Sequence, residues 1–163
     1  MSKDDRRQYF LELADKYKSV IAKVCSVYSS ASIPFADLYQ EVMINLWSGL
    51  DSFRGDSKMS TWIYRLALNT CITMQRHSRR HHLDALPIEA GFDIPDNQGD
   101  ADELRTLYAL IARLDPVVKA LITLWLDEKS YDEISAIIGI SKANVATRLF
   151  RAKQRLSHLA NDE

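Results

Sequence analysis

A mixed aromatic and basic face runs along the stretch of residues 53–82, and its chemistry is that of a nucleic-acid contact. At 3.6 residues per turn, one side of the stretch carries Trp62, Arg65, Asn69, Thr73, Arg76 and Arg80. Guanidinium groups hold phosphates, and a large aromatic ring stacks on unpaired bases. The stretch also ends in a cluster of arginine and histidine side chains over residues 76–82. The pattern therefore indicates a groove that binds a nucleic-acid strand.

A second polar row lies near the end of the chain. Asn144, Arg148, Arg151 and Arg155 share one side of a predicted helix, with Val145, Leu149, Ala152 and Leu156 on the opposite side. A short helix precedes it: Ser130 and Glu133 have capping-box spacing, Gly139 supplies the turn, and Ser141 caps the second helix. This order predicts a helix-turn-helix whose early residues reach base edges and whose later cations reach phosphates. The alternative is an ordinary amphipathic surface helix.

The sequence offers little for catalysis or metal binding. His77 and His81 are four residues apart, but arginines surround them and no third ligand has a convincing spacing. The chain has no glycine-rich phosphate loop and no nucleophile elbow, so an enzyme is not expected. We expect no metal and no cofactor. Cys25 and Cys71 are far apart and are best read as small core residues in a reducing cytoplasm.

Helical periodicity extends over most of the chain and predicts an all-α fold. The expected helices cover residues 9–28, 37–50, most of 53–82, 102–114 and 117–126, followed by the helix-turn-helix. Asp37 and Gln40 have the spacing of a capping box at the start of the second helix. Ile44 lies on the polar face of that helix, as either a partner contact or a lone exposed apolar residue.

The charge distribution divides the chain into two parts. Residues 1–83 hold 12 Lys and Arg against 8 Asp and Glu, residues 84–104 hold seven acids and no base, and residues 105–163 hold 9 bases against 7 acids. Pro and Gly punctuate residues 84–101, which predicts an acidic, flexible linker between domains of residues 1–83 and 102–163. The net charge of −1 gives no strong bulk attraction to DNA. No run of about 18 apolar residues is present, so no membrane insertion is expected.

The ordered set of motifs resembles a known family. DLYQEVMINLW (residues 37–47), FRGDSKMSTWIYRLALN (residues 53–69) and SYDEISAIIGISKANVATRLFRAKQRL (residues 130–156) together resemble the extracytoplasmic-function (ECF) group of bacterial sigma factors. The resemblance implies two small helical domains, a sigma domain 2 bundle and a sigma domain 4 helix-turn-helix. Its implied partners are promoter DNA, the β′ clamp helices and β flap of core RNA polymerase, and an anti-sigma factor. The acidic linker would run toward the active-site and RNA-exit channels of the polymerase.

The same resemblance implies roles for individual residues. Docking on the β′ clamp would fall to Asp37, Gln40, Glu41, Ile44 and Asn45. Recognition and melting of the −10 element would fall to Arg54, Ser57, Lys58, Trp62, Arg65, Asn69, Arg76, Arg79 and Arg80, with Trp62 as the aromatic that props open the melted duplex. Recognition of the −35 element would fall to Ser141, Lys142, Asn144, Thr147, Arg148 and Arg151. Asn144 can pair bidentately with adenine, so we expect an adenine contact there.

Several positions depart from the family pattern. An arginine is common where this chain has Leu68, and an acid is common where it has Thr73. Ala143-Asn144-Val145 stands where Gly-Thr-Val is frequent, Ala146 replaces a basic residue, and Ser135 replaces alanine. These changes leave the fold intact and bear on which promoter is read.

Two other functions are compatible with parts of the pattern. A two-domain helix-turn-helix regulator would bind a palindromic operator by itself, often as a dimer. A protein-binding adaptor would leave the two basic rows without a role. A sigma factor, by contrast, binds DNA tightly only with polymerase, which fixes the separation of two weak reading heads.

Overall fold

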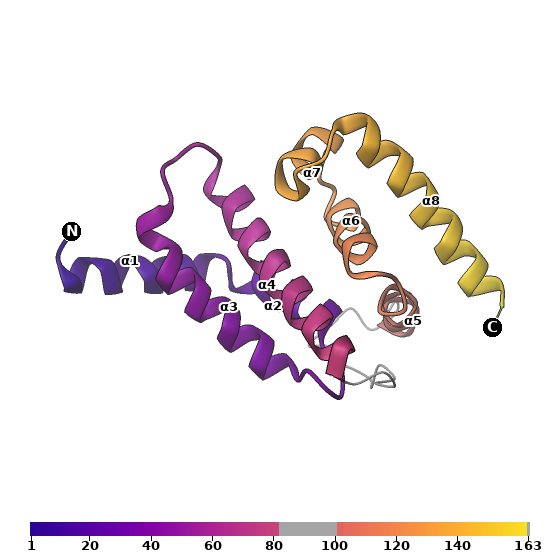
Figure 1. Cartoon of the computed structure of the whole chain (residues 1–163), viewed down its shortest axis with the longest axis horizontal. Helices are drawn as coiled ribbons and strands as arrows, with labels where there is room; N and C mark the ends of the chain where they lie inside the picture. The colour runs from indigo at the N-terminus through magenta and orange to yellow at the C-terminus, as the bar shows by residue number, and fades with distance from the viewer. Residues whose placement is uncertain (82–100, 163) are drawn as a thin grey trace.

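The computed structural model describes residues 1–81 and 101–162, and for residues 79–81 and 101 it describes the backbone alone. Within these ranges the regular structure is helical, as predicted. The predicted linker lies outside the described residues except for its last position. Figure 1 shows the N-terminal helices on one side and the C-terminal helices on the other, with the long helix α4 facing both groups.

The N-terminal half consists of four α-helices and a short 3₁₀ turn. They are α1 (Lys3–Lys16), α2 (Lys18–Tyr28), α3 (Phe35–Gly49), η1 (Leu50–Ser52) and α4 (Met59–His81). Helices α2, α3 and α4 pack on one another, and α1 lies against α2 and α3. The buried residues of α2 and α3 recur at three- and four-residue spacing, which turns one stripe of each helix toward α4. This bundle positions the loop between α3 and α4.

Two predicted helix boundaries in this half were wrong. The single helix expected over residues 9–28 is two helices, because Ser2 and Asp5 form a capping box that starts α1 at Lys3 and the backbone at Tyr17 leaves helical geometry. Helix α3, which the sequence analysis predicted as the second helix, begins at Phe35 rather than after Asp37. The Pro34 carbonyl accepts the first hydrogen bonds of this helix. Asp37 therefore lies in the first turn, where its charge suits the helix dipole.

The C-terminal half contains α5 (Ala101–Ile111), α6 (Pro116–Leu126), α7 (Tyr131–Ile138) and α8 (Lys142–Asn161). Helix α6 begins with a proline at its first position, where no amide hydrogen is needed. Helices α6, α7 and α8 pack mutually, and α5 lies against α8. The apolar sequence of α6 reflects this position, since most of its residues are buried.

The helix-turn-helix caps confirm the local prediction. The Ser130 hydroxyl accepts a hydrogen bond from the Glu133 amide at 3.1 Å, and the Ser141 hydroxyl accepts one from the Asn144 amide at 3.1 Å. Gly139 ends α7 in the left-handed region with φ of 84°. These contacts lie within a few residues of one another, so local chemistry determines where α7 begins and ends and where α8 begins.

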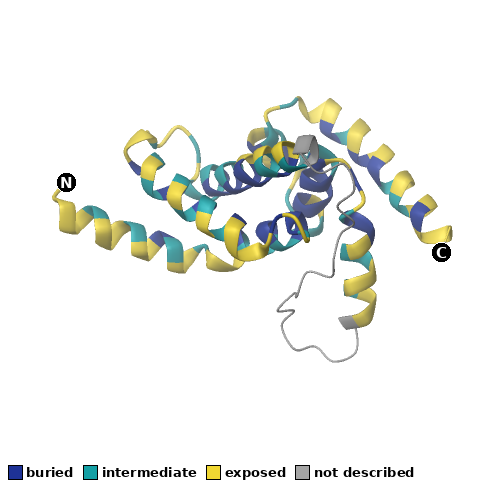
Figure 2. Cartoon of the chain, turned by 60° about the horizontal axis from the view of Figure 1, so that its bottom comes forward, coloured by how far each residue is buried: buried dark blue, intermediate teal, exposed yellow. Residues whose placement is uncertain are grey.

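The two halves meet along α4. Helices α6 and α7 pack against α4, and α6 also contacts α2. Figure 2 shows the buried residues gathered at this centre, while α1 and α8 expose their outer faces. The buried side chains of both halves belong to one continuous cluster, which runs from Leu13 to Leu159.

Replacement of Gly139 should destabilise the C-terminal half. Gly139→Ala places a Cβ at a positive φ, which costs about 1 kcal/mol, although no atom lies within 4 Å of that Cβ. Gly139→Asn should lose less, because asparagine tolerates this conformation better. Urea unfolding of the full chain measures both variants. Equal stability of the alanine variant and the wild type would contradict the strain argument.

Candidate nucleic-acid interface

Helix α8 presents the predicted reading row on the side opposite its packed face. Val145, Leu149 and Ala152 are buried against the rest of the C-terminal half. The predicted −35 residues are all exposed; they are Ser141, Lys142, Asn144, Thr147, Arg148 and Arg151. The periodicity in the sequence therefore gave the correct orientation of the row. Such a face can contact base edges at its start and phosphates further along.

Local hydrogen bonds order the start of the row. Arg148 Nε donates to Asn144 Oδ1 at 3.2 Å, so the guanidinium fixes the orientation of the amide. Lys142 Nζ lies 3.4 Å from Asp132 Oδ2 on the preceding helix. The Thr147 hydroxyl donates to the Ala143 carbonyl at 3.1 Å. The reading face is thus partly pre-arranged, which reduces the entropy lost on binding.

The loop between η1 and α4 carries the second candidate surface. Arg54 and Lys58 are exposed in it, and Ser57 is half-buried. Gly55 has φ of 78°, which lets the chain turn sharply between these side chains. The Phe53 ring attaches the base of the loop to α4, because its centroid lies 5.2 Å from the centroid of the Trp62 ring.

Trp62 is packed at the base of this loop. Its indole is half-buried, and a Cβ added at Gly49 would lie 3.2 Å from its ring. A residue with a side chain at position 49 would push the indole away from α3. The absence of a side chain at Gly49 therefore sets how closely Trp62 approaches the end of α3.

The outer face of α4 continues from Trp62. Asn69, Thr73 and Arg76 are exposed along it, as the sequence predicted. Arg79 and Arg80 lie outside the residues whose side chains are described. Asn69, Thr73 and Arg76 therefore form a strip of exposed polar groups on α4, beyond the half-buried Trp62. Its chemistry suits the backbone of a single strand.

Arg65 does not join this strip. Its guanidinium donates from Nη2 to the Ala136 carbonyl and from Nε to the Ile137 carbonyl, the latter at 3.4 Å. Both carbonyls lie in the last turn of α7, where they lack helical partners and where a cation is favoured by the dipole. The sequence grouped Arg65 with the basic face because it sits at the edge of that face, next to the second half.

Leu68 is 1% exposed and belongs to the core rather than to the outer strip. Tyr64, Cys71 and Gln75 are also buried on the same side of α4. The buried stripe is wider than an isolated amphipathic helix requires because α6 and α7 cover this second side. A departure from the family pattern at position 68 is therefore a packing feature in this arrangement.

The predicted clamp-docking residues lie on α3 in two environments. Asp37, Gln40 and Ile44 are exposed, and Ile44 exposes 49% of its surface. Glu41 is half-buried, as is Asn45, whose amide donates to the Thr70 hydroxyl at 2.9 Å. Asn45 therefore ties α3 to α4 as well as bordering the exposed surface.

Two polar features escaped the sequence reasoning. One is a contact of Asp127 with Lys23 and Tyr64, which joins the two halves across 104 and 63 residues. The other is Arg6, whose Nη2 donates to the Trp47 carbonyl at 2.9 Å, lies 3.2 Å from Asp51 Oδ2, and stacks over the Trp47 ring. No local pattern in the sequence identifies either set, because their partners are distant along the chain.

The described residues hold no cluster of three or more side chains suited to a metal ion. In the same part of the chain, no helix has both the length and the apolar character needed to cross a membrane.

Comparison with known proteins identifies similar sequences. The protein family described as "Sigma-70 region 2" matches residues 13–81, and the family described as "Sigma-70, region 4" matches residues 104–156. The ECF RNA polymerase sigma-E factor of Escherichia coli K12 is 33% identical over 97% of this chain and 89% of its own length. The sigma-E factor of Haemophilus influenzae is 31% identical over 94% and 88%.

Two solved structures share the fold. The sigma factor RpoE of Bartonella quintana, in complex with the anti-sigma factor NepR, has a TM-score of 0.71 at 24% identity, over 98% of both chains. CnrH, in complex with the cytosolic domain of CnrY, has a TM-score of 0.68 at 20% identity, over 96% of this chain and 90% of that one.

Arg6 should hold α1 against the base of the loop. In Arg6→Met the charged hydrogen bond to the Trp47 carbonyl is lost, and amide hydrogen exchange in residues 3–10 should rise about tenfold. Arg7→Met is the matched control, because Arg7 is exposed on the same helix. Mass spectrometry of deuterated peptides measures both. The same exchange rate in the two variants would contradict this role.

Proposed function

This chain belongs to the extracytoplasmic-function group of sigma factors, the promoter-specificity subunits of bacterial RNA polymerase, and we propose from that premise which residues carry each contact. Residues 1–83 act as domain 2 and residues 102–163 as domain 4, with residues 84–101 as the connection. The chain supplies specificity and no catalysis of its own, and it works in the cytoplasm with the polymerase. The observation that carries this assignment is the pair of exposed polar rows on α4 and α8.

Domain 4 reads the −35 element with α8. The start of the helix enters the major groove, where the Asn144 amide meets a base edge and the Lys142 ammonium meets a phosphate. Arg148 orients that amide through the hydrogen bond at 3.2 Å. Arg151, one turn further along the exposed row, contacts the DNA backbone. Ser141 caps the helix, and Thr147 borders the row.

Domain 2 binds the −10 element with the loop and the outer strip of α4. Arg54 and Lys58 attract the strand, and Ser57 lines the loop in which an extruded base is held. Trp62 supports the upstream edge of the melted region. Asn69 and Arg76 follow the same strand, together with Arg79 and Arg80. Arg65 joins them once it leaves the α7 carbonyls.

The exposed face of α3 docks on the β′ clamp helices. Ile44 supplies an apolar centre with 49% of its surface exposed, and polar groups surround it. The surrounding groups are Asp37, Gln40, Glu41 and Asn45. Domain 4 contacts the β flap, and an anti-sigma factor is a further partner, as NepR is for the sigma factor RpoE of Bartonella quintana.

Transcription from purified components tests the function and the α8 row together. Core polymerase with this chain should initiate at a cognate promoter, whereas the free chain should bind the same DNA weakly. Asn144→Ala should weaken binding to the cognate promoter roughly 5- to 150-fold. It should also relax the sequence preference at one base position of the −35 element. Arg151→Ala should weaken binding to all sequences and lower the salt slope by about 1.

Lys153→Ala is the matched control for these variants. Lys153 lies on the other side of α8, with its ammonium 4.0 Å from the centre of the Trp125 ring. It should leave promoter binding within a few-fold of the wild type. Tight binding of a palindromic site by the free chain would instead favour a helix-turn-helix regulator.

Strand opening tests Trp62. Holoenzyme with Trp62→Ala should form normally but open the −10 region more slowly, because the aromatic support of the melted edge is gone. Trp62→Phe should keep part of the contact with the Phe53 ring and recover part of the rate. Permanganate reactivity of thymines measures opening, and a melting curve checks that each variant folds. Unchanged opening in the folded alanine variant would refute this role.

A further inference from the structure

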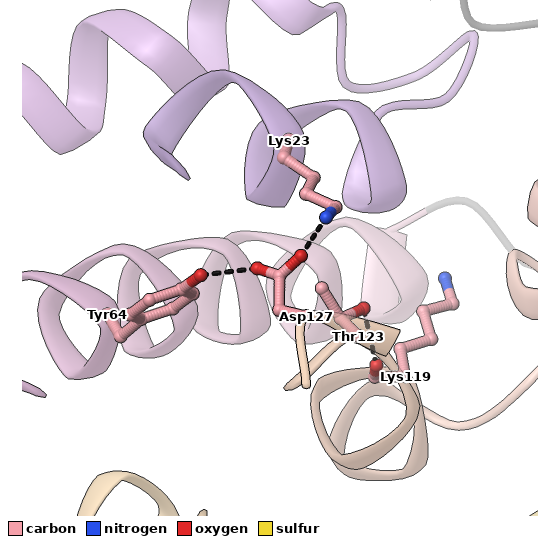
Figure 3. A network of polar contacts seen from close by, with 5 residues as sticks. All are labelled: Lys23, Tyr64, Lys119, Thr123 and Asp127. Atoms are coloured by element: carbon pink, nitrogen blue, oxygen red, sulfur yellow. Dashed lines mark hydrogen bonds and ion pairs between the residues drawn. The ribbon is translucent and has the colours of Figure 1, made fainter. Parts of the chain in front are cut away.

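The Asp127 carboxylate lies between the two halves with both oxygens engaged. The Lys23 ammonium, from α2, contacts Oδ1, and the Tyr64 hydroxyl, from α4, donates to Oδ2. Figure 3 shows the carboxylate, at the end of α6, pointing between these two helices. One acid of the C-terminal half therefore holds two separate helices of the N-terminal half.

The C-terminal half by itself gives the Asp127 carboxylate no favourable surroundings. Asp127 is the C-cap residue of α6, where its amide donates to the Thr123 carbonyl. The carboxyl end of a helix carries partial negative charge, so an acid there is unfavourable without a compensating cation. Glu128, which follows, takes a positive φ of 60° and turns the chain away. The compensating groups come from the other half.

Burial makes this contact sensitive to the loss of either partner. The side chain of Asp127 is 14% exposed and that of Lys23 is 35% exposed. Burial lowers the pKa of the Lys23 ammonium and raises the pKa of the Tyr64 phenol. The first change reflects the partial desolvation of the ammonium, and the second favours the protonated phenol, which is the donor in this contact. Removal of Asp127 would leave a partly buried cation without its carboxylate.

Two further contacts close the same seam. The Tyr28 hydroxyl donates to the Pro116 carbonyl at 2.5 Å, and Arg65 donates to the carbonyls at the end of α7. Arg65 is also on the proposed −10 surface. While its Nε and Nη2 donate to the α7 carbonyls, the same two donors cannot turn to a DNA phosphate, and separation of the halves releases them. The closed arrangement and DNA binding therefore compete for one side chain.

We propose that Asp127, held by Lys23 and Tyr64, is a latch that keeps the free chain closed and withholds Arg65 from DNA. Closure also packs α6 and α7 against α4, so the latch adds a polar contact to an apolar interface and is lost when the halves separate. Polymerase separates the halves by binding each of them. The consequence for DNA rests on the proposed function, whereas the closed state of the free chain does not.

Distance measurements on the free full-length chain test the latch without DNA or polymerase. Spin labels on cysteines introduced at Ser48 of α3 and Ser157 of α8, both exposed, report the separation of the halves. Cys25 and Cys71, which are buried in the closed chain, are replaced by alanine in every variant so that opening exposes no second thiol to the label. The wild type should give one narrow distance distribution. Asp127→Ala should lower the ratio of closed to open chains about 10- to 100-fold. Its distance distribution should therefore be broader than that of the wild type.

Exchanging the charges of Lys23 and Asp127 provides a second test, which still decides the question if Asp127→Ala folds poorly. Lys23→Asp alone should open the chain, and Lys23→Asp with Asp127→Lys should restore the narrow distribution. Asp132→Ala is the matched control, because it removes an acid paired with Lys142 inside the C-terminal half. A broad distribution in the wild type, or a narrow one in both Lys23→Asp and Asp127→Ala, would overturn the latch. So would a failure of the folded charge exchange to restore closure.

A binding experiment separates this inference from the proposed function. Free Asp127→Ala should bind a single-stranded −10 oligonucleotide about tenfold or more tighter than the wild type, because the competent fraction rises. Adding Arg65→Ala should remove that gain. An unchanged affinity in an opened chain would overturn the competition for Arg65. Failure of the wild-type holoenzyme to transcribe would refute the proposed function and leave the distance result standing.

Discussion

Helix α4 is buried from two sides, and the rest of the molecule is arranged around that constraint. Helices α2 and α3 cover one side, and α6 and α7 cover the next. Among the described side chains of α4, the exposed ones form a narrow strip that includes Asn69, Thr73 and Arg76. Because the N-terminal bundle fixes this strip relative to the loop before α4, the proposed strand-binding surface is rigid at its centre. The C-terminal half covers its edge and removes Arg65 from it.

The same packing bears on electrostatics. The chain has a net charge of −1, and the commitment of Arg65 and Lys23 to the seam leaves fewer cations for phosphates in the closed state. Affinity for DNA rises with the number of phosphates neutralised, so we expect the closed chain to bind DNA weakly. In the proposed function, polymerase would hold the two reading surfaces of an open chain at a fixed separation, which turns weak contacts into a strong one. Near-neutral charge is thus compatible with promoter recognition that depends on polymerase.

The sequence predicted those features whose interactions are local. The caps at Ser130 and Ser141, the turn at Gly139 and the exposed row on α8 all follow from contacts within a few residues or from helical periodicity. The orientation of α4 was predicted for its outer strip by the same reasoning. The latch at Asp127 was not, because its partners lie 63 and 104 residues away and an acid after an apolar helix suggests only a turn. Contacts between residues that are far apart in the chain produce no periodic pattern in the sequence.

The burial of Leu68 changes how the promoter preference of this chain should be sought. From the sequence, Leu68 and Thr73 were equal candidates to alter the −10 sequence that is read. In the closed chain Leu68 is 1% exposed and Thr73 is exposed on the strip, so Thr73 can meet a strand before the halves separate and Leu68 cannot. Leu68 instead replaces a charge that the seam could not hold without a partner. We therefore assign the departure from the family at position 68 to the closure of the two halves, and we expect the loop, Asn69 and Thr73 to bear on the choice of −10 sequence.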